Sequence, residues 1–138
     1  LSFMYYHGKG TSKNYQKAFE SFKKLAEQGE ADAQYSLGLM YYHGKGTPKN
    51  MQKAFKWYKQ AAEQGNTKAQ YNLGATYYFG KGTTKNYQKA YTHFLIYDYL
   101  EQEKHTTNKY LNKLEQKLTP QAIINAQNEA DKIIQGFK

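Results

Sequence analysis

The chain has 138 residues, the length of one domain, and 17% of them are aromatic, with Tyr supplying 15. Its net charge is +9, all 20 basic residues are Lys, and Cys is absent, which excludes disulfides and thiolate metal sites. No apolar stretch approaches the roughly 20 residues that span a bilayer. The positive charge favours acidic proteins, nucleic acid or anionic envelope polymers as partners, although sites that read bases usually employ Arg.

A segment built around Gly-Lys-Gly occurs three times at a spacing of 36 residues, at residues 8–10, 44–46 and 80–82. The surroundings repeat as well: two aromatic residues come shortly before each copy, and Lys-Asn and then Gln-Lys-Ala follow it. A fixed period of this size indicates a stacked repeat array. Such arrays present extended surfaces for binding. The expected units are residues 1–30, 31–66 and 67–104.

The second unit is complete and predicts two helices. Apolar and small residues recur at three- and four-residue steps from Ala33 to Tyr42, which is typical of one helix face. Gly44 is expected to end this helix, and Asn50 is a good N-cap for the next one. The buried stripe of that second helix is expected to be Ala54, Phe55, Tyr58, Ala61 and Ala62. Gly38 and Gly74 recur within helices, which predicts that another backbone passes close by.

The end of the chain departs from the repeat. Tyr97-Asp98 and Glu101 replace the closing signature, so the helix is expected to run on to about Lys104. A break at residues 105–107 and a short helix over residues 108–117 should follow. Thr119-Pro120 then starts a last helix, with an apolar stripe of Ile123, Ala126, Ala130, Ile133, Ile134 and Phe137. We expect residues 105–138 to be capping helices that cover the open face of the last repeat.

The repeated pattern resembles that of a known family. Ala-x-Ala-Gln-Tyr-x-Leu-Gly-x-x-Tyr-x-x-Gly-x-Gly, followed by Asn-x-x-Lys-Ala-x-x-x-Tyr-x-x-Ala-Ala-x-Gln-Gly, is similar to the Sel-one-like repeat (SLR), a relative of the tetratricopeptide repeat. The resemblance covers about the first two thirds of the chain and implies an all-α fold. It implies an α/α solenoid, a right-handed superhelix of antiparallel helix pairs with a C-terminal helical cap. Leu1-Ser2-Phe3 aligns with residues 37–39, so we expect further repeats upstream. Because the tail is interpreted as a terminal cap, we expect the C-terminus to be native.

By analogy with tetratricopeptide arrays, the first helix of each unit lines a concave face. The residues expected to bind a partner there are Tyr6, His7, Tyr35, Leu39, Tyr42, His43, Tyr71, Tyr78 and Phe79. Tyrosine offers a large, rigid contact area with a polar tip, which suits recognition of a peptide or helix. The alternative is that many of these tyrosines pack between units. Tyr5, Tyr41 and Tyr77 are assigned to the core.

A repeated set of lysines forms a basic edge along the loops and the first turns of the second helices. Its members are Lys9, Lys13, Lys17, Lys45, Lys49, Lys53, Lys81, Lys85 and Lys89. This basic edge could steer an acidic partner; the alternative is a solvated, solubilising edge.

Other site chemistries find no support in the residues. The phosphate-binding loop requires Ser or Thr directly after Gly-Lys and a preceding strand, whereas here Gly follows Lys and a helix precedes it. His7 and His43 lie one unit apart, too far to share a metal easily. Carboxylates are scattered, and no catalytic arrangement is evident. We therefore expect no catalytic residues, no cofactor and no metal.

The sequence thus predicts a non-catalytic adaptor that binds a peptide or helix of another protein on an aromatic-lined concave face. The family resemblance implies a bacterial cell-envelope, signalling or host-interaction role, and a periplasmic or secreted location is favoured over a cytoplasmic one. The alternative is binding of an anionic polymer, a cell-wall glycan or, less expected, nucleic acid, through the basic edge. A hydrolase is a third hypothesis, which no residue constellation supports. The sequence leaves the oligomeric state open.

Overall fold

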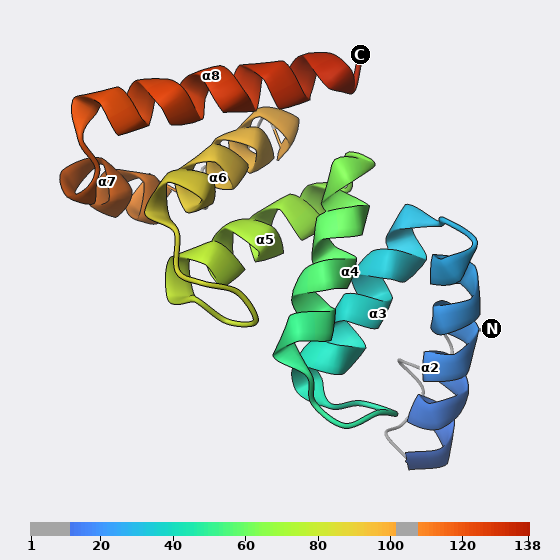
Figure 1. Cartoon of the computed structure of the whole chain (residues 1–138). Coiled ribbons are helices and arrows are strands. Elements are labelled where there is room, and N and C mark those ends of the chain that lie inside the picture. Colours follow the sequence, from blue (N-terminus) through green and yellow to red (C-terminus); the bar gives the residue numbers. More distant parts are fainter. Residues whose placement is uncertain (1–11, 102–107) are drawn as a thin grey trace. The chain divides into compact units, whose positions relative to one another are not determined.

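The computed structural model describes residues 12–101 and 108–138, and within these ranges every regular element is a helix (Figure 1). The chain divides into two compact units, residues 1–66 and 67–138. The first contains α2 (Ser12–Glu27), α3 (Ala31–His43) and α4 (Met51–Glu63). The second contains α5 (Thr67–Phe79), α6 (Tyr87–Glu101), α7 (Asn108–Lys117) and α8 (Pro120–Gly136). The all-α fold is confirmed.

Local signals set the helix ends as the sequence predicts. Helix α3 ends at Gly44, whose φ of +69° lies in the left-handed region that glycine adopts without a Cβ penalty. Helix α4 begins after Asn50, whose side-chain oxygen accepts a hydrogen bond from the Lys53 backbone N–H at 3.0 Å. The left-handed glycine recurs one repeat later at Gly80, and the N-cap hydrogen bond recurs between Asn86 and the Lys89 N–H.

The core of the first unit joins α2, α3 and α4. Small residues and large rings alternate in it, so the helices pack closely. Its buried members are Ala26, Ala33, Leu37, Tyr41, Ala54 and Tyr58. Tyr41 and, in the second unit, Tyr77 are each 6% exposed, which confirms their assignment to the core. Tyr5 lies outside the described residues.

The glycines within the helices make room for an aromatic ring. A Cβ on Gly38 would lie 2.7 Å from two ring atoms of Tyr58, with the Ala54 carbonyl oxygen at 3.3 Å. Gly74 meets the Phe94 ring in the same way, at 2.9 Å. The predicted close approach is therefore present, but the nearest atoms belong to a ring and not to a second backbone.

A buried glutamine ties the helices of the first unit together. The Gln34 side chain, 4% exposed, donates to the Ala26 carbonyl at 3.2 Å and accepts from the Gln64 side chain at 2.8 Å. Its counterpart Gln70 is 1% exposed and lies 2.8 Å from His93 Nδ1. Buried amide groups are costly unless they are hydrogen-bonded, so these glutamines fix how the helices meet. The repeat pattern contains both glutamines, but the sequence did not predict this role for them.

The tail begins and ends its helices where the sequence indicates. The structure confirms the predicted short helix as α7, and α8 begins at Pro120. The Thr119 hydroxyl accepts from the Ala122 N–H at 3.1 Å, which satisfies one of the unpaired donors of the first turn. The described part of α6 ends at Glu101, so the predicted extension to Lys104 and the break at residues 105–107 lie outside the described residues.

The two tail helices cover different faces of α6. Helix α7 contacts Tyr91 and Phe94, the counterparts of Phe19 and Phe22. Phe19 and Phe22 pack in the core that α2 shares with α3. Helix α7 therefore contacts α6 through the positions equivalent to those through which α3 contacts α2. Helix α8 lies along another side of α6 (Figure 1) and buries Ile96 completely.

Candidate partner-binding surface

The aromatic residues predicted on α3 share one side of that helix and are held partly against the core. Tyr35, Leu39 and Tyr42 are half-buried against the core of the first unit, while His43 is exposed. The Tyr42 and His43 rings meet edge to face at 5.0 Å between centroids. The structure therefore fixes these side chains and leaves the His43 end open to solvent. Tyr6 and His7, predicted for the same surface, lie outside the described residues.

In the second compact unit, residues 67–138, part of the predicted surface packs against α7 of the same chain. Tyr110 of α7 contacts the rings of Tyr71, Tyr78 and Phe79, with centroids 6.5, 5.2 and 6.4 Å away. It also stacks on Phe94 at 5.1 Å with an interplanar angle of 9°. Burial is the main reason, and Tyr110 the next, that the pKa of Tyr71 is raised above its ordinary value. Phe79 is still 51% exposed.

Tyr71 and Tyr78 therefore pack against α7, whereas Phe79 is the exposed edge. Partner binding by these residues stays a prediction. Sequence reasoning missed Tyr110 because the tail has no repeat register. The available signal was its place on the same helical stripe as Leu111 and Leu114.

A partly buried hydrogen bond joins α7 to α6. The Tyr91 hydroxyl donates to the Glu115 carboxylate at 2.7 Å, and the Tyr91 side chain is 2% exposed. Burial first, and then the hydrogen bond to Glu115, raise the pKa of Tyr91 to about 12. The equivalent residues in the preceding units are Phe19 and Phe55, which have no hydroxyl. This polar anchor is therefore specific to the third repeat.

The stability that the Tyr91–Glu115 hydrogen bond contributes should depend on pH. The Tyr91 proton is held more tightly in the folded chain, with a pKa of about 12 against an ordinary 10. The stabilisation is therefore complete below pH 10 and is lost as pH rises towards 12. We expect Tyr91→Phe to lower the free energy of unfolding below pH 10, and the difference from the parent chain to shrink across this window. Urea unfolding of both chains tests this, and a constant difference would contradict it.

Several lysines of the basic edge lie over tyrosine rings. Lys53 Nζ is 5.5 Å from the centroid of Tyr41, and Lys89 Nζ is 5.5 Å from that of Tyr77, so one cation–π contact repeats in both units. Lys45 lies 5.2 Å from the Tyr15 ring and Lys85 5.8 Å from the Tyr87 ring. Such contacts stabilise a fold by about 0.5–1 kcal/mol at exposed sites. Part of the basic edge therefore has a structural role, and steering of a partner stays a prediction.

Lys49 and Lys81 are exposed in their loops and Lys17 on α2, whereas the side chains of Lys9 and Lys13 are outside the described part of the chain.

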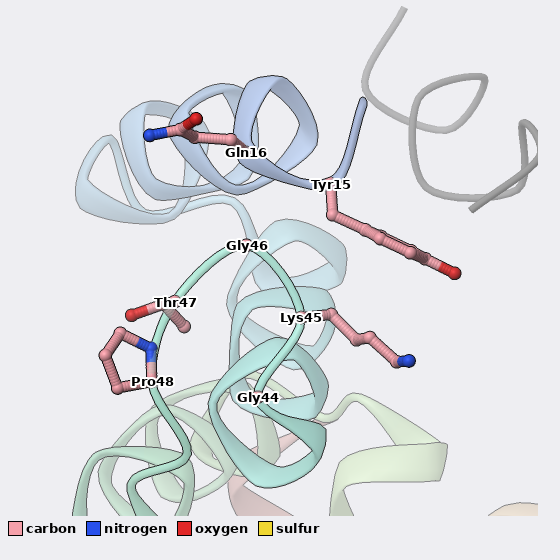
Figure 2. A pocket seen from close by; sticks show the side chains of 7 residues that line it. All are labelled: Tyr15, Gln16, Gly44, Lys45, Gly46, Thr47 and Pro48. Carbon is pink, nitrogen blue, oxygen red and sulfur yellow. The ribbon is translucent and has the colours of Figure 1, made fainter. Parts of the chain in front are cut away.

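The Gly-Lys-Gly loop of the second repeat borders a shallow, open hollow of about 520 Å³. Figure 2 shows that its lining side chains do not converge: Tyr15 and Lys45 point to one side of the loop, Gln16 and Thr47 to the other. Between them, Gly46 lies directly against the Tyr15 carbonyl. The loop thus packs one repeat on another and presents no convergent polar groups to a ligand.

In residues 12–101 and 108–138, no three His, Asp or Glu side chains lie together as a metal site would require. No helix described there has the length and apolarity to cross a membrane.

Comparison with known proteins identifies the repeat. The Sel1 repeat family matches residues 1–30, 31–66 and 67–96. The chain belongs to the Sel1 repeat family. Members of this family are generally protein-interaction modules with no catalytic activity. No curated protein matches the chain.

Two solved Sel1 repeat structures are similar to this chain, both from bacteria. One is c5321, a protective antigen of uropathogenic Escherichia coli strains with an SLR fold, at 33% identity and a TM-score of 0.91 over 99% of this chain. The other is a Sel1 repeat protein from Oxalobacter formigenes, at 44% identity and a TM-score of 0.64 over 68% of this chain. The chain spans 29% and 39% of these two proteins. The predicted solenoid fold is confirmed, and the likeness to c5321 extends over α7 and α8.

Proposed function

We propose that this Sel1 repeat chain binds a peptide or helix of another protein through the exposed aromatic edge at the end of the first helix of each repeat. The observation that supports it is a pair of rings repeated 36 residues apart. Tyr42 supports exposed His43 at 5.0 Å, and Tyr78 supports Phe79, 51% exposed, at 4.9 Å. Rigidly held rings lose little entropy on binding, which is why aromatic residues dominate binding hot spots.

The cellular setting is part of the proposal. A bacterial adaptor in the cell envelope, in signalling or in host interaction, placed in the periplasm or secreted, is consistent with the likeness to c5321, a protective antigen. Binding of an anionic polymer through the basic edge is the competing outcome. The cation–π contacts of Lys53 and Lys89 weaken that competitor, because these lysines already have partners within the protein.

The test removes the exposed rings of His43, which lies outside the contacts of α7, and of Phe79, which also contacts Tyr110 of α7. His43→Ala and Phe79→Ala, singly and together, are compared with Tyr99→Ala, which truncates an aromatic residue that is 45% exposed on α6. We expect the double variant to lose partner capture about tenfold or more, and Tyr99→Ala to retain it. Equal capture by all variants would refute the proposal. Polymer binding would instead weaken steeply between about 50 and 200 mM salt.

A further inference from the structure

Helix α7 contacts the third repeat through a single stripe of side chains. Tyr110 inserts among four rings of α5 and α6, and Leu114 is fully buried. Leu111 is 8% exposed, and Glu115 accepts the hydrogen bond from Tyr91. These residues follow Tyr110 by one, four and five positions, which places them on one side of a helix. The opposite side of α7 is exposed and carries Lys109, Asn112, Lys113 and Gln116. At the end of the helix, Lys117 adds a cation–π contact with the Tyr87 ring of α6, at 5.4 Å from its centroid.

The surface beneath α7 combines apolar and polar recognition. The aromatic part comes from Tyr71, Tyr78, Phe79 and Phe94. The polar part is the hydroxyl of Tyr91, which requires an acceptor because a buried donor without a partner is costly. A helix that binds here must therefore supply a large side chain for the rings and an acceptor for Tyr91. Helix α7 supplies both.

Helix α7 is also the shorter of the two tail helices, with 10 residues against 17 in α8. Isolated helices shorter than about 12–15 residues are marginal in water. Docking to the third repeat is therefore what keeps α7 helical, and segments with few buried contacts open most readily.

We propose that the surface of the third repeat beneath α7 is a helix-docking site, and that α7 is an internal ligand which a partner helix of the same chemistry displaces. The partner carries an aromatic residue, leucines one and four positions later, and a carboxylate five positions later, matching Tyr110, Leu111, Leu114 and Glu115. The inference deepens the proposed function and rests on it for the existence of a protein partner. Because α7 is tethered, its effective concentration is high, and a partner must outcompete it.

The probe is a labelled synthetic peptide with the sequence of residues 108–118, titrated into the full chain. In the Tyr110→Ala chain the internal ligand loses its ring contacts, so we expect the peptide to bind about tenfold more tightly than it binds the parent chain. Lys113→Ala changes an exposed residue of the same helix and should match the parent. A peptide with its own Tyr replaced by Ala, or its Glu by Gln, should bind about tenfold more weakly.

Two results would overturn the proposal: equal peptide affinity for the parent and Tyr110→Ala chains, or equal affinity of the original and Ala-substituted peptides. If Tyr110→Ala fails to fold, Glu115→Gln is titrated instead, since it weakens the internal ligand without removing a ring. The readout is separate from partner capture at His43, which lies on α3 and is not part of the surface beneath α7. Loss of capture there without peptide binding here would leave the proposed function standing and refute the displaceable helix.

Discussion

Gly46→Ala is expected to lower the free energy of unfolding by about 3 kcal/mol or more, because strain and overpacking act at the same position. Gly46 has φ +74°, in the left-handed region where a Cβ is strained. A Cβ there would also collide with the Tyr15 carbonyl and lie 2.9 Å from the Phe19 Cβ. A backbone group cannot move aside as the end of a flexible side chain can. Urea unfolding followed by circular dichroism measures the loss.

Gly29→Ala is the matched control for this exchange. Gly29 has φ +95°, but a Cβ there would have nothing within 4 Å. It should therefore show the conformational cost alone, about 1–2 kcal/mol. The excess at Gly46 measures contact between the loop of one repeat and the helix of the preceding one. Equal losses at both glycines would mean that Gly46 is needed only for the backbone conformation of the turn.

The Gly-Lys-Gly loop of the second repeat has a packing role within the first compact unit. Its second glycine brings the loop onto α2, and Lys45 lies over the Tyr15 ring beside it. Both contacts join the second repeat to the residues that precede it. In this repeat the motif therefore has an explanation that involves no ligand.

Most of the fold follows from local signals in the sequence. Gly44 and Asn50 act through their own backbone and side chain, so they predict helix ends without knowledge of the tertiary structure. The Thr119-Pro120 pair predicts the start of α8 in the same way. The core faces follow from helical periodicity, because the same positions recur in each repeat.

The candidate site was less predictable because it depends on contacts between helices. The exposure of Phe79 and the half-burial of Tyr78 depend on where α7 docks. Nothing in the repeat register fixes that position, since α7 is outside the repeat. Likewise, the lysines of the basic edge have the same spacing whether they face solvent or lie over a ring, as Lys53 does over Tyr41.

One readable signal in the sequence identifies the surface that α8 covers. Helix α4 carries two polar residues, exposed Lys59 and half-buried Gln60, whereas the equivalent residues of α6 are Leu95 and Ile96. An apolar pair at positions that are polar in another repeat indicates an additional partner for that face. In the structure that partner is α8, whose Ala130 and Ile134 pack on Ile96.

Ile96→Gln, which installs the residue found at the equivalent position of the second repeat, should therefore release α8 from α6. Ile96 is 0% exposed, so the change removes roughly 1.5–3 kcal/mol of apolar burial and adds about 1–3 kcal/mol for an amide without a partner. Ile96→Val keeps the face apolar and should cost only about 0.5–1.5 kcal/mol.

Urea unfolding gives the stability difference, and limited proteolysis should cleave α8 sooner in the Gln variant alone. If both variants lose the same stability and resist protease equally, α8 does not depend on this apolar face, and its attachment must come from other contacts such as that of Thr92 with the Ala126 carbonyl.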